Sequence, residues 1–215
     1  MKIAKEGLIF IVPALALCIL FLTVSLWFPF VIFLIITLAF CYFFRDPKRS
    51  IPLNKNTLLA PADGRIVKIQ TEESHPSFPS PVNVISIFLS LFDVHITRAP
   101  LSGTVKEIDY KPGRFFPAYK DEASSRNESN SLFINAAKLN ILVKQIAGVA
   151  ARRIKCFVKK NERITKGQKM GLIYFGSRVD LFLPQDIQLK VSLNQKVKAG
   201  LTEIGEIKNE GKNKV

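Results

Sequence analysis

The segment Val82-Asn83-Val84-Ile85-Ser86-Ile87-Phe88 is rich in β-branched residues and follows a hydrophobic period of about two. That period is typical of a β-strand, because successive side chains of a strand point to opposite faces of the sheet. Similar segments with turns between them predict short strands over residues 103–110, 138–145, 153–159 and 187–193. The sequence beyond residue 45 has no long helical periodicity. A mainly β, mostly antiparallel domain is therefore expected.

Two segments are harder to assign. Residues 139–151 fit either a helix or a strand, and Gly148 together with the β-branched content favours a strand. Residues 112–130 are polar and have no clear period, so we expect a mobile loop near the functional site.

Two pairs of segments resemble each other within the chain. Gly64-Arg65-Ile66-Val67-Lys68-Ile69 resembles Gly103-Thr104-Val105-Lys106-Glu107-Ile108, and Ile164-Thr165-Lys166-Gly167 resembles Val197-Lys198-Ala199-Gly200. Turns can resemble one another by chance, but such pairs are characteristic of lipoyl-like, barrel-sandwich folds. The expected fold is a compact antiparallel barrel or sandwich with lipoyl-like hairpins.

The N-terminal part is strongly apolar, since residues 8–44 contain no Asp, Glu, Lys, Arg or His. A single helix over this run would be roughly 55 Å long, against a hydrocarbon core of about 30 Å. We therefore expect a transmembrane helical hairpin over residues 1–44, with two short spans that turn near residues 25–29, and a β domain over 45–215. One long tilted helix and a signal peptide are the alternatives. Basic residues flank both ends of the run, which favours both ends in the cytoplasm.

The chain is basic, with 31 Lys and Arg against 17 Asp and Glu and a formal net charge of +14. A basic balance fits nucleic acid or an anionic membrane surface, and the apolar hairpin favours the membrane. No basic helix with interleaved aromatic residues is visible in the sequence, so no nucleic-acid partner is expected. Cys18 and Cys41 lie in the apolar run and Cys156 lies outside it, which fits a reducing compartment.

Histidine is scarce, and the two copies have different settings. His75 stands in a Pro-rich loop and is expected to be an ordinary surface residue, whereas His95 follows an apolar strand. Two histidines this far apart cannot form a His-rich zinc site, so no metal is expected. Asp63-Gly64 and Gly176-Ser177 are each weak signals alone, because Asp-Gly marks a turn and a glycine weakens a strand.

Several motifs occur in a recognisable order: Phe43-Phe44-Arg45-Asp46-Pro47-Lys48-Arg49, Pro61-Ala62-Asp63-Gly64, Asp93-Val94-His95, Arg98-Ala99-Pro100-Leu101-Ser102-Gly103, Tyr110-Lys111-Pro112-Gly113, Gln145-Ile146-Ala147-Gly148, Ala151-Arg152-Arg153-Ile154 and Gly171-Leu172-Ile173-Tyr174-Phe175-Gly176-Ser177-Arg178-Val179. Over essentially the whole chain the sequence resembles the short form of phosphatidylserine decarboxylase, as the unprocessed proenzyme. The most specific element is the late Phe-Gly-Ser-Arg motif.

The resemblance implies a self-processing, pyruvoyl-dependent enzyme that converts phosphatidylserine to phosphatidylethanolamine and CO2. The Ser177 hydroxyl would attack the Gly176 carbonyl, and elimination would release a β chain of residues 1–176. The new end of the α chain, residues 177–215, would carry the covalent pyruvoyl cofactor that forms a Schiff base with the substrate amine. The two chains would remain together as a heterodimer, and a homodimer is a reasonable expectation.

The resemblance also assigns roles to two residues that carried weak signals alone. Asp63 matches the processing Asp of longer members, and His95 matches the histidine linked to decarboxylation, where it would act as the acid and base. The place of a second histidine is taken by Arg98, which cannot be a base because it stays charged. Either His95 serves both self-cleavage and decarboxylation, which we favour, or cleavage relies on strain and Asp63.

The resemblance places the catalytic domain on the cytoplasmic side of the cell (inner) membrane. Arg152, Arg153 and Arg178 are candidates for the lipid phosphate, although solvated surface charge is the commoner role of any one arginine. Two other interpretations stay open at this point. One is a membrane-anchored, non-enzymatic adaptor with a barrel-sandwich domain, and the other is the same chemistry on an archaeal-type ether phosphoserine lipid.

Overall fold

The computed structural model describes residues 2–72, 76–114, 116, 122–136, 139–148 and 153–207. The chain forms two compact units, Met1–Lys48 and Arg49–Val215, and each is described by itself below. His75 and Arg152, which the sequence analysis singled out, lie outside the described residues.

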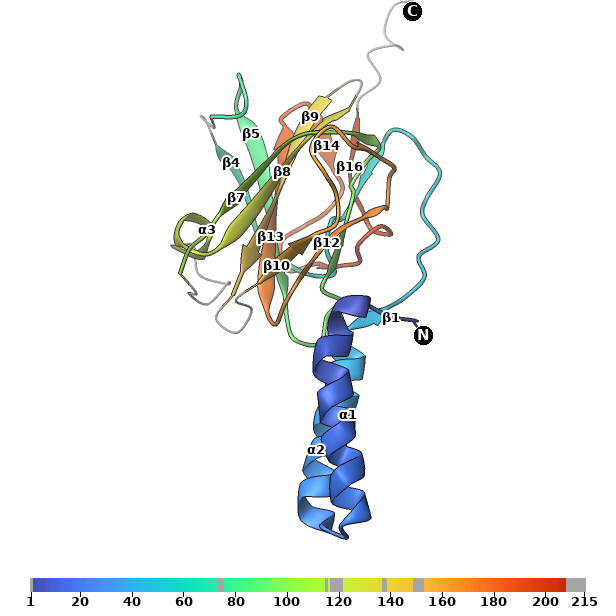
Figure 1. The fold of residues 1–215 in the computed structure, drawn as a ribbon. Coiled ribbons are helices and arrows are strands. Elements are labelled where there is room, and N and C mark those ends of the chain that lie inside the picture. The colour runs from blue at the N-terminus through green and yellow to red at the C-terminus, as the bar shows by residue number, and fades with distance from the viewer. Residues whose placement is uncertain are drawn as a thin grey trace, which may run out of the picture. The chain divides into compact units, whose positions relative to one another are not determined.

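The first unit is a pair of apolar helices joined by a tight turn (Figure 1). The short strands β1 (Lys2–Ile3) and β2 (Arg45–Asp46) pair with each other, and the 3-10 helix η1 (Lys5–Gly7) leads into α1 (Leu8–Thr23). Helix α2 (Trp27–Phe43) follows a turn in which Ser25 has a φ of 58°. The expected pair of helices is present, with its turn at the expected place, and its two membrane spans stay a prediction.

Aromatic side chains join the two helices of this unit. Phe10 stacks on Phe44 with ring centroids 5.5 Å apart, and Phe21 stacks on Phe33 at 5.4 Å. By length and composition Lys5–Thr23 could cross a membrane, whereas Trp27–Phe43 is shorter. The apolar surface of the pair indicates association with a membrane.

The second unit is mainly β, as predicted. Its elements are β3 (Thr57–Leu59), β4 (Gly64–Glu72), β5 (Val82–Leu89), β6 (Ile96–Arg98), β7 (Gly103–Lys111), α3 (Glu122–Arg126), β8 (Ser129–Ala136), β9 (Leu139–Ala147), β10 (Ile154–Cys156), β11 (Arg163–Ile164), β12 (Lys169–Ile173), β13 (Ser177–Pro184), β14 (Ile187–Leu189), β15 (Lys196–Val197) and β16 (Glu203–Ile207). An antiparallel eight-stranded sheet has the order β11-β7-β8-β9-β13-β5-β4-β15. Two three-stranded sheets, β10-β12-β6 and β14-β16-β3, complete the unit.

Most expected strands are confirmed, and 139–151 contains a strand rather than a helix. Two are shorter than expected, because 153–159 and 187–193 each keep only three residues in β10 and β14 before the chain turns. The expectation of a loop over 112–130 is wrong in part, because α3 and the start of β8 lie within it. The polar residues at the start of β8 hid this strand, although Ser129 and Asn130 are buried.

The sheet order is symmetric about the β9–β13 pair, because the second unit contains the same arrangement twice. The strands of one half, β6 to β12, follow one another in the chain without a strand of the other half between them. The other half is divided between β3–β5 and β13–β16. The registers match strand by strand: Arg65 pairs with Phe88 as Thr104 pairs with Asn135, and Lys196 pairs with Arg65 as Arg163 pairs with Thr104. Both sequence similarities noted above are therefore structural.

Backbone hydrogen bonds repeat in the same way. The Asn161 N–H donates to the Val105 carbonyl oxygen, and the Asn194 N–H donates to that of Ile66. The Gly167 N–H donates to Ala99, and the Gly200 N–H donates to Ala60. Gly167 and Gly200 have φ values of +79° and +72°, a conformation that favours glycine. These turns recur because both halves need the same chain reversal.

The main core lies on one face of the eight-stranded sheet. Leu181, Val143 and Ile87 from three adjacent strands are fully buried there, together with residues from the smaller sheets. The opposite face carries a smaller cluster around Phe182 and Leu142. Because side chains alternate along β13, Ser177 shares the main core face with Val179 and Leu181, whereas Arg178 and Asp180 lie on the other.

Gly64 provides a test of this architecture. Its φ is +149°, and a Cβ atom there would lie 2.1 Å from the Phe88 carbonyl oxygen on the paired strand. We expect Gly64→Ala to lower the free energy of unfolding by about 3 kcal/mol or more, because the backbone of β4 or β5 must shift. Chemical denaturation in detergent measures this, and Lys106→Ala, at an exposed position of β7, is the control that should change little. Equal stability of the two variants would contradict the described β4–β5 register.

Candidate active site

Ser177 is the first residue of β13 and lies at one end of the eight-stranded sheet. It pairs with Ala147 of β9 on one side and with Leu89 of β5 on the other. Its side chain is fully buried, and its Oγ makes no hydrogen bond within the described part of the chain. A buried hydroxyl without a partner carries an energetic cost, which marks Ser177 as more than a structural residue.

The backbone immediately before Ser177 is strained. Phe175 and Gly176 have φ values of +48° and +66°, so two consecutive residues adopt the left-handed conformation. The conformation is unfavourable for phenylalanine because of its Cβ atom. A Cβ atom at Gly176 would have ample room, with Leu91 Cδ2 at 4.0 Å as its nearest neighbour. Glycine is therefore required here by the backbone conformation and not by crowding.

His95 contacts this strained turn directly. Its Nε2 accepts a hydrogen bond from the Gly176 N–H at 3.1 Å, and its Nδ1 lies 3.0 Å from the Asp93 carbonyl oxygen. An amide N–H can only donate and a carbonyl oxygen can only accept, so the contacts assign a proton to Nδ1 and a lone pair to Nε2. The imidazole is 1 % exposed. This tautomer presents a basic nitrogen to the residue that precedes Ser177.

Asp63 is buried beside Arg49. Its Oδ2 accepts a hydrogen bond from Arg49 Nη2 at 2.7 Å, and its Oδ1 accepts one from the Ala199 N–H at 2.8 Å. Burial raises the pKa of the Asp63 carboxyl, and the charge of Asp93 acts in the same direction, whereas Arg49 and the Ala199 N–H oppose the rise. The described contacts thus hold Asp63 firmly and place it within electrostatic range of Asp93, two residues before His95.

Arg98, at the place of the second histidine, and two of the arginines considered for the lipid phosphate, Arg153 and Arg178, have different settings. Arg98 is buried, and its Nη1 donates a hydrogen bond to the Gly167 carbonyl oxygen at 3.0 Å. Its backbone N–H donates to the Pro61 carbonyl oxygen, which joins β6 to the turn that contains Asp63. Arg178 is also buried, and its Nε donates to Asp180 at 2.6 Å on the sheet face opposite Ser177. Arg153 is exposed, and its carbonyl oxygen accepts a hydrogen bond from the Tyr174 N–H, two residues before Gly176. Of Arg153 and Arg178, only Arg153 is exposed.

Sequence reasoning missed two parts of the site. Arg49 ends the basic motif that follows the apolar run, and nothing in its local sequence connects it to Asp63, fourteen residues later. A buried row of polar groups was missed as well: Asn130 donates to Gln145, and Gln145 contacts Thr97, which donates to the Gly171 carbonyl oxygen. These residues come from four strands, so only the sheet register brings them together.

Comparison with known proteins identifies the family. The model of the phosphatidylserine decarboxylase family matches residues 36–205. The phosphatidylserine decarboxylase proenzyme of Syntrophus aciditrophicus is 39 % identical over 207 residues, covering 94 % of this chain and 96 % of that protein. The proenzymes of Magnetococcus marinus and a Wolbachia species are 40 % and 42 % identical, with at least 93 % of each chain covered.

This chain belongs to the phosphatidylserine decarboxylase family. The expected resemblance is confirmed, and the chain is a decarboxylase of a family whose members are made as proenzymes. Membership in a family of enzymes removes the non-enzymatic adaptor as an interpretation.

The Asp63–Arg49 pair gives a testable prediction about stability. Both side chains are largely buried, at 11 % and 7 % exposure, so Asp63→Asn leaves the Arg49 charge without its partner. In a Ser177→Ala background we expect a loss of about 3 kcal/mol in the free energy of unfolding. The double variant Asp63→Asn with Arg49→Met should recover most of this loss, and chemical denaturation measures all three proteins. A double variant no more stable than Asp63→Asn would contradict a paired role for Arg49.

Proposed function

We propose that the chain cleaves itself between Gly176 and Ser177 and then decarboxylates phosphatidylserine to phosphatidylethanolamine by means of a pyruvoyl group derived from Ser177. The observation that carries this proposal is the buried Ser177 hydroxyl without a described partner. It follows two left-handed residues, and the second of them, Gly176, donates its N–H to His95 Nε2. Family membership supports the same chemistry. The products of cleavage are a β chain of residues 1–176 and an α chain of residues 177–215.

Cleavage begins with attack of Ser177 Oγ on the Gly176 carbonyl carbon, and the hydroxyl proton passes to a base. The peptide bond is replaced by an ester, and the Ser177 amine is released from the Gly176 carbonyl. Elimination breaks the ester, frees the Gly176 carboxylate and leaves dehydroalanine at position 177. Water then converts this residue to the pyruvoyl group and releases ammonia. Strain at Phe175 and Gly176 favours the reaction, because cleavage relieves it.

His95 is the proposed base, since its Nε2 lone pair already faces the Gly176 N–H. For cleavage, the Ser177 hydroxyl replaces this N–H as the donor to Nε2. Asp63 acts in processing as a side chain held in place by Arg49 and by the Ala199 N–H, both of which oppose the rise in its pKa that burial causes. Arg98, buried against Gly167, has a positioning role and leaves His95 as the base of both reactions.

The residues at the start of β13 fit a pyruvoyl group. Position 177 is buried and starts a strand that is paired on both sides. The basic Nε2 nitrogen of His95 contacts the N–H of the preceding residue, Gly176. The pyruvoyl group supplies the electron sink that loss of CO2 from an amino acid requires. His95 then delivers a proton to the carbon that lost CO2, for which an imidazole is well suited near neutral pH.

The surroundings of the site suit a phospholipid. Leu91 and Phe92 form the turn that precedes His95, and they are 53 % and 75 % exposed. The turn is held by Asp93, which accepts hydrogen bonds from the Ser90 N–H and hydroxyl. Leu91, whose Cδ2 is the nearest atom to a Cβ placed on Gly176, and the exposed Phe92 of the same turn form a surface for acyl chains, and the exposed Arg153 provides a cation for the phosphate. Ester and ether lipids share this headgroup, so an ether phosphoserine lipid is a second candidate substrate.

We place the catalytic domain, residues 45–215, on the cytoplasmic side of the cell membrane and residues 1–44 in the membrane as two short spans. Support comes from Lys2 and Lys5 before the helices and from Arg45 and Lys48 after them. After cleavage β13 remains between β9 and β5 of the β chain, which keeps the two chains together as a heterodimer. Two such heterodimers would form the proposed homodimer.

Intact mass under denaturing conditions tests self-cleavage. The wild-type chain is expected to give two pieces, residues 1–176 and residues 177–215, the smaller with a pyruvoyl group at its N-terminus. Ser177→Ala, which lacks the nucleophile, should remain one chain, and Ser192→Ala is the control that should cleave normally. A wild-type chain that stays intact while the purified protein decarboxylates phosphatidylserine would overturn the pyruvoyl proposal.

His95→Ala tests the shared base. We expect its cleavage to slow by about 10²-fold or more, because the hydroxyl of Ser177 loses its general base. The time course of cleavage after synthesis in a cell-free system, followed by mass, measures the rate. Cleavage of His95→Ala at the wild-type rate would show that processing relies on strain and Asp63 instead.

A further inference from the structure

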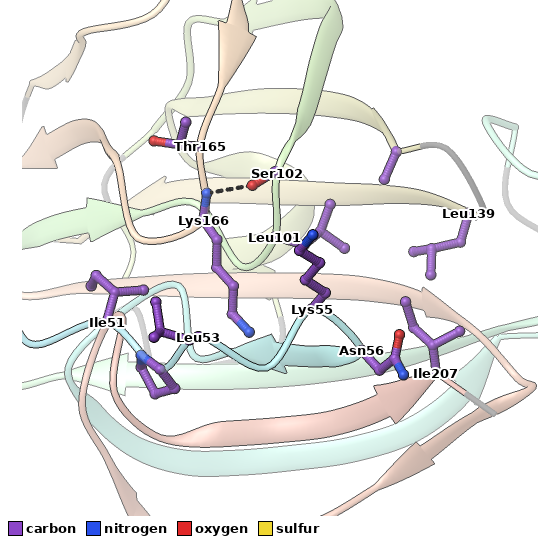
Figure 2. Close-up of a pocket in the computed structure, with 12 residues that line it drawn as sticks. Ile51, Leu53, Lys55, Asn56, Leu101, Ser102, Leu139, Thr165, Lys166 and Ile207 are labelled. Atoms are coloured by element: carbon purple, nitrogen blue, oxygen red, sulfur yellow. Dashed lines mark hydrogen bonds between the residues drawn. The ribbon is translucent and has the colours of Figure 1, made fainter. Parts of the chain in front are cut away.

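A large cavity, whose lining residues are drawn in Figure 2, lies at the end of the sheet away from Ser177. Its volume is about 710 Å³, within the range of ligand pockets. Leu139 is one of its lining residues, whereas Ser177 pairs with Ala147 at the other end of the same strand, β9. Eight residues of extended strand separate these positions by roughly 27 Å. The cavity is thus distinct from the candidate active site.

The internal duplication relates this cavity to the candidate active site. Leu139 begins β9 and pairs with Ala136 of β8, as Ser177 begins β13 and pairs with Leu89 of β5. The counterpart of His95 is Asn56, because the Ile207 N–H donates to the Asn56 carbonyl oxygen and the Ile173 N–H donates to that of His95. Three strands of each half therefore frame equivalent spaces.

The counterpart of Asp63 is Ser102. Asp63 Oδ1 accepts the Ala199 N–H at 2.8 Å, and Ser102 Oγ accepts the Lys166 N–H at 2.9 Å, the bond drawn in Figure 2. Both acceptors stand just before the long strands β4 and β7, and both donors lie in the matching glycine turns. In this half of the sheet, Leu139 stands in the place of the nucleophile, Asn56 in that of the base and Ser102 in that of the carboxylate. The cavity therefore cannot cleave the chain or decarboxylate a substrate.

The cavity occupies the place equivalent to the candidate active site, but different side chains line it. Ile51, Leu53, Leu101 and Leu139 give it an apolar lining, and its described lining residues include Lys55 and Lys166 but no carboxylate. Lys166 Nζ donates to the Asn54 carbonyl oxygen and to Thr57 Oγ1, both at 2.7 Å, which uses two of its three N–H donors. Burial lowers the pKa of Lys166, with the charge of Glu203 opposing the shift. An anion at this place would compensate the burial of the ammonium group.

We propose that this cavity is a second, non-catalytic lipid site that binds an anionic amphiphile, with the acyl chain against the leucine and isoleucine side chains and the anionic head against Lys55 and Lys166. The occupant follows from the match of an apolar lining with two lysines and no described acidic residue. This site does not depend on the activity proposed above, because it is argued from the geometry of the other half.

Photolabelling tests the proposal on the full chain. The probe is palmitate with a terminal diazirine, added to the uncleaved Ser177→Ala protein in nanodiscs of phosphatidylcholine, with labelled peptides identified by mass spectrometry. We expect labels on residues 51–56 and 101–102 as well as on the membrane helices. Unlabelled palmitate and lysophosphatidylglycerol compete for the site, and their relative potency shows whether a carboxylate or a phosphodiester is preferred.

Two variants separate charge from shape. Lys55→Gln with Lys166→Gln should reduce cavity labelling at least fivefold, and Leu139→Trp, which fills the space, should reduce it similarly. Lys159→Gln with Lys160→Gln removes two exposed lysines elsewhere and is the matched control. Thermal unfolding checks that each variant is folded. Labels confined to residues 8–43, or cavity labelling unchanged in folded Leu139→Trp, would overturn the site, and equal labelling by the corresponding fatty alcohol would overturn the preference for an anion.

Discussion

The central position of β13 is the constraint on which the rest of the structure depends. This strand pairs with β9 and β5 over most of its length, so its first residue is fixed between Ala147 and Leu89. The turn before it must then reverse the chain within a few residues, which places Phe175 and Gly176 in left-handed conformations. A stable sheet thus holds a strained backbone turn next to the buried Ser177 hydroxyl, and packing elsewhere in the sheet compensates the energetic cost of this strain.

Under the two proposals made above, the internal duplication divides chemistry and lipid binding between the two ends of one sheet. Matching registers create two equivalent spaces, framed in one half by His95 and Asp63 and in the other by Asn56 and Ser102. The backbone that holds these side chains is the same, so the differences in side chains alone decide what each space can do. Function in such a fold belongs to the site and not to the architecture.

Much of the candidate site could be predicted from the sequence because its residues stand in local motifs. Ser177 follows Gly176 in a distinctive late motif and His95 ends the Asp93-Val94-His95 motif, so the resemblance of these motifs to the family pointed to both residues without a structure. Arg49 and the row Asn130, Gln145 and Thr97 could not, because their contacts join strands far apart in the chain. The short lengths of β10 and β14 also depended on where neighbouring strands end.

The sequence by itself determined the apolar helix pair and the β class of the second unit, which follow from local composition and hydrophobic period. Through its motif order it also resembled the family, and that resemblance nominated Ser177 as the proposed nucleophile and His95 as the proposed base. Only the tertiary structure decided that His95 Nε2 faces Gly176, that Arg49 neutralises Asp63, and that the two sequence similarities are halves of one duplicated sheet. The reason is physical: strand register and burial are set by the whole sheet, and no single segment contains that information.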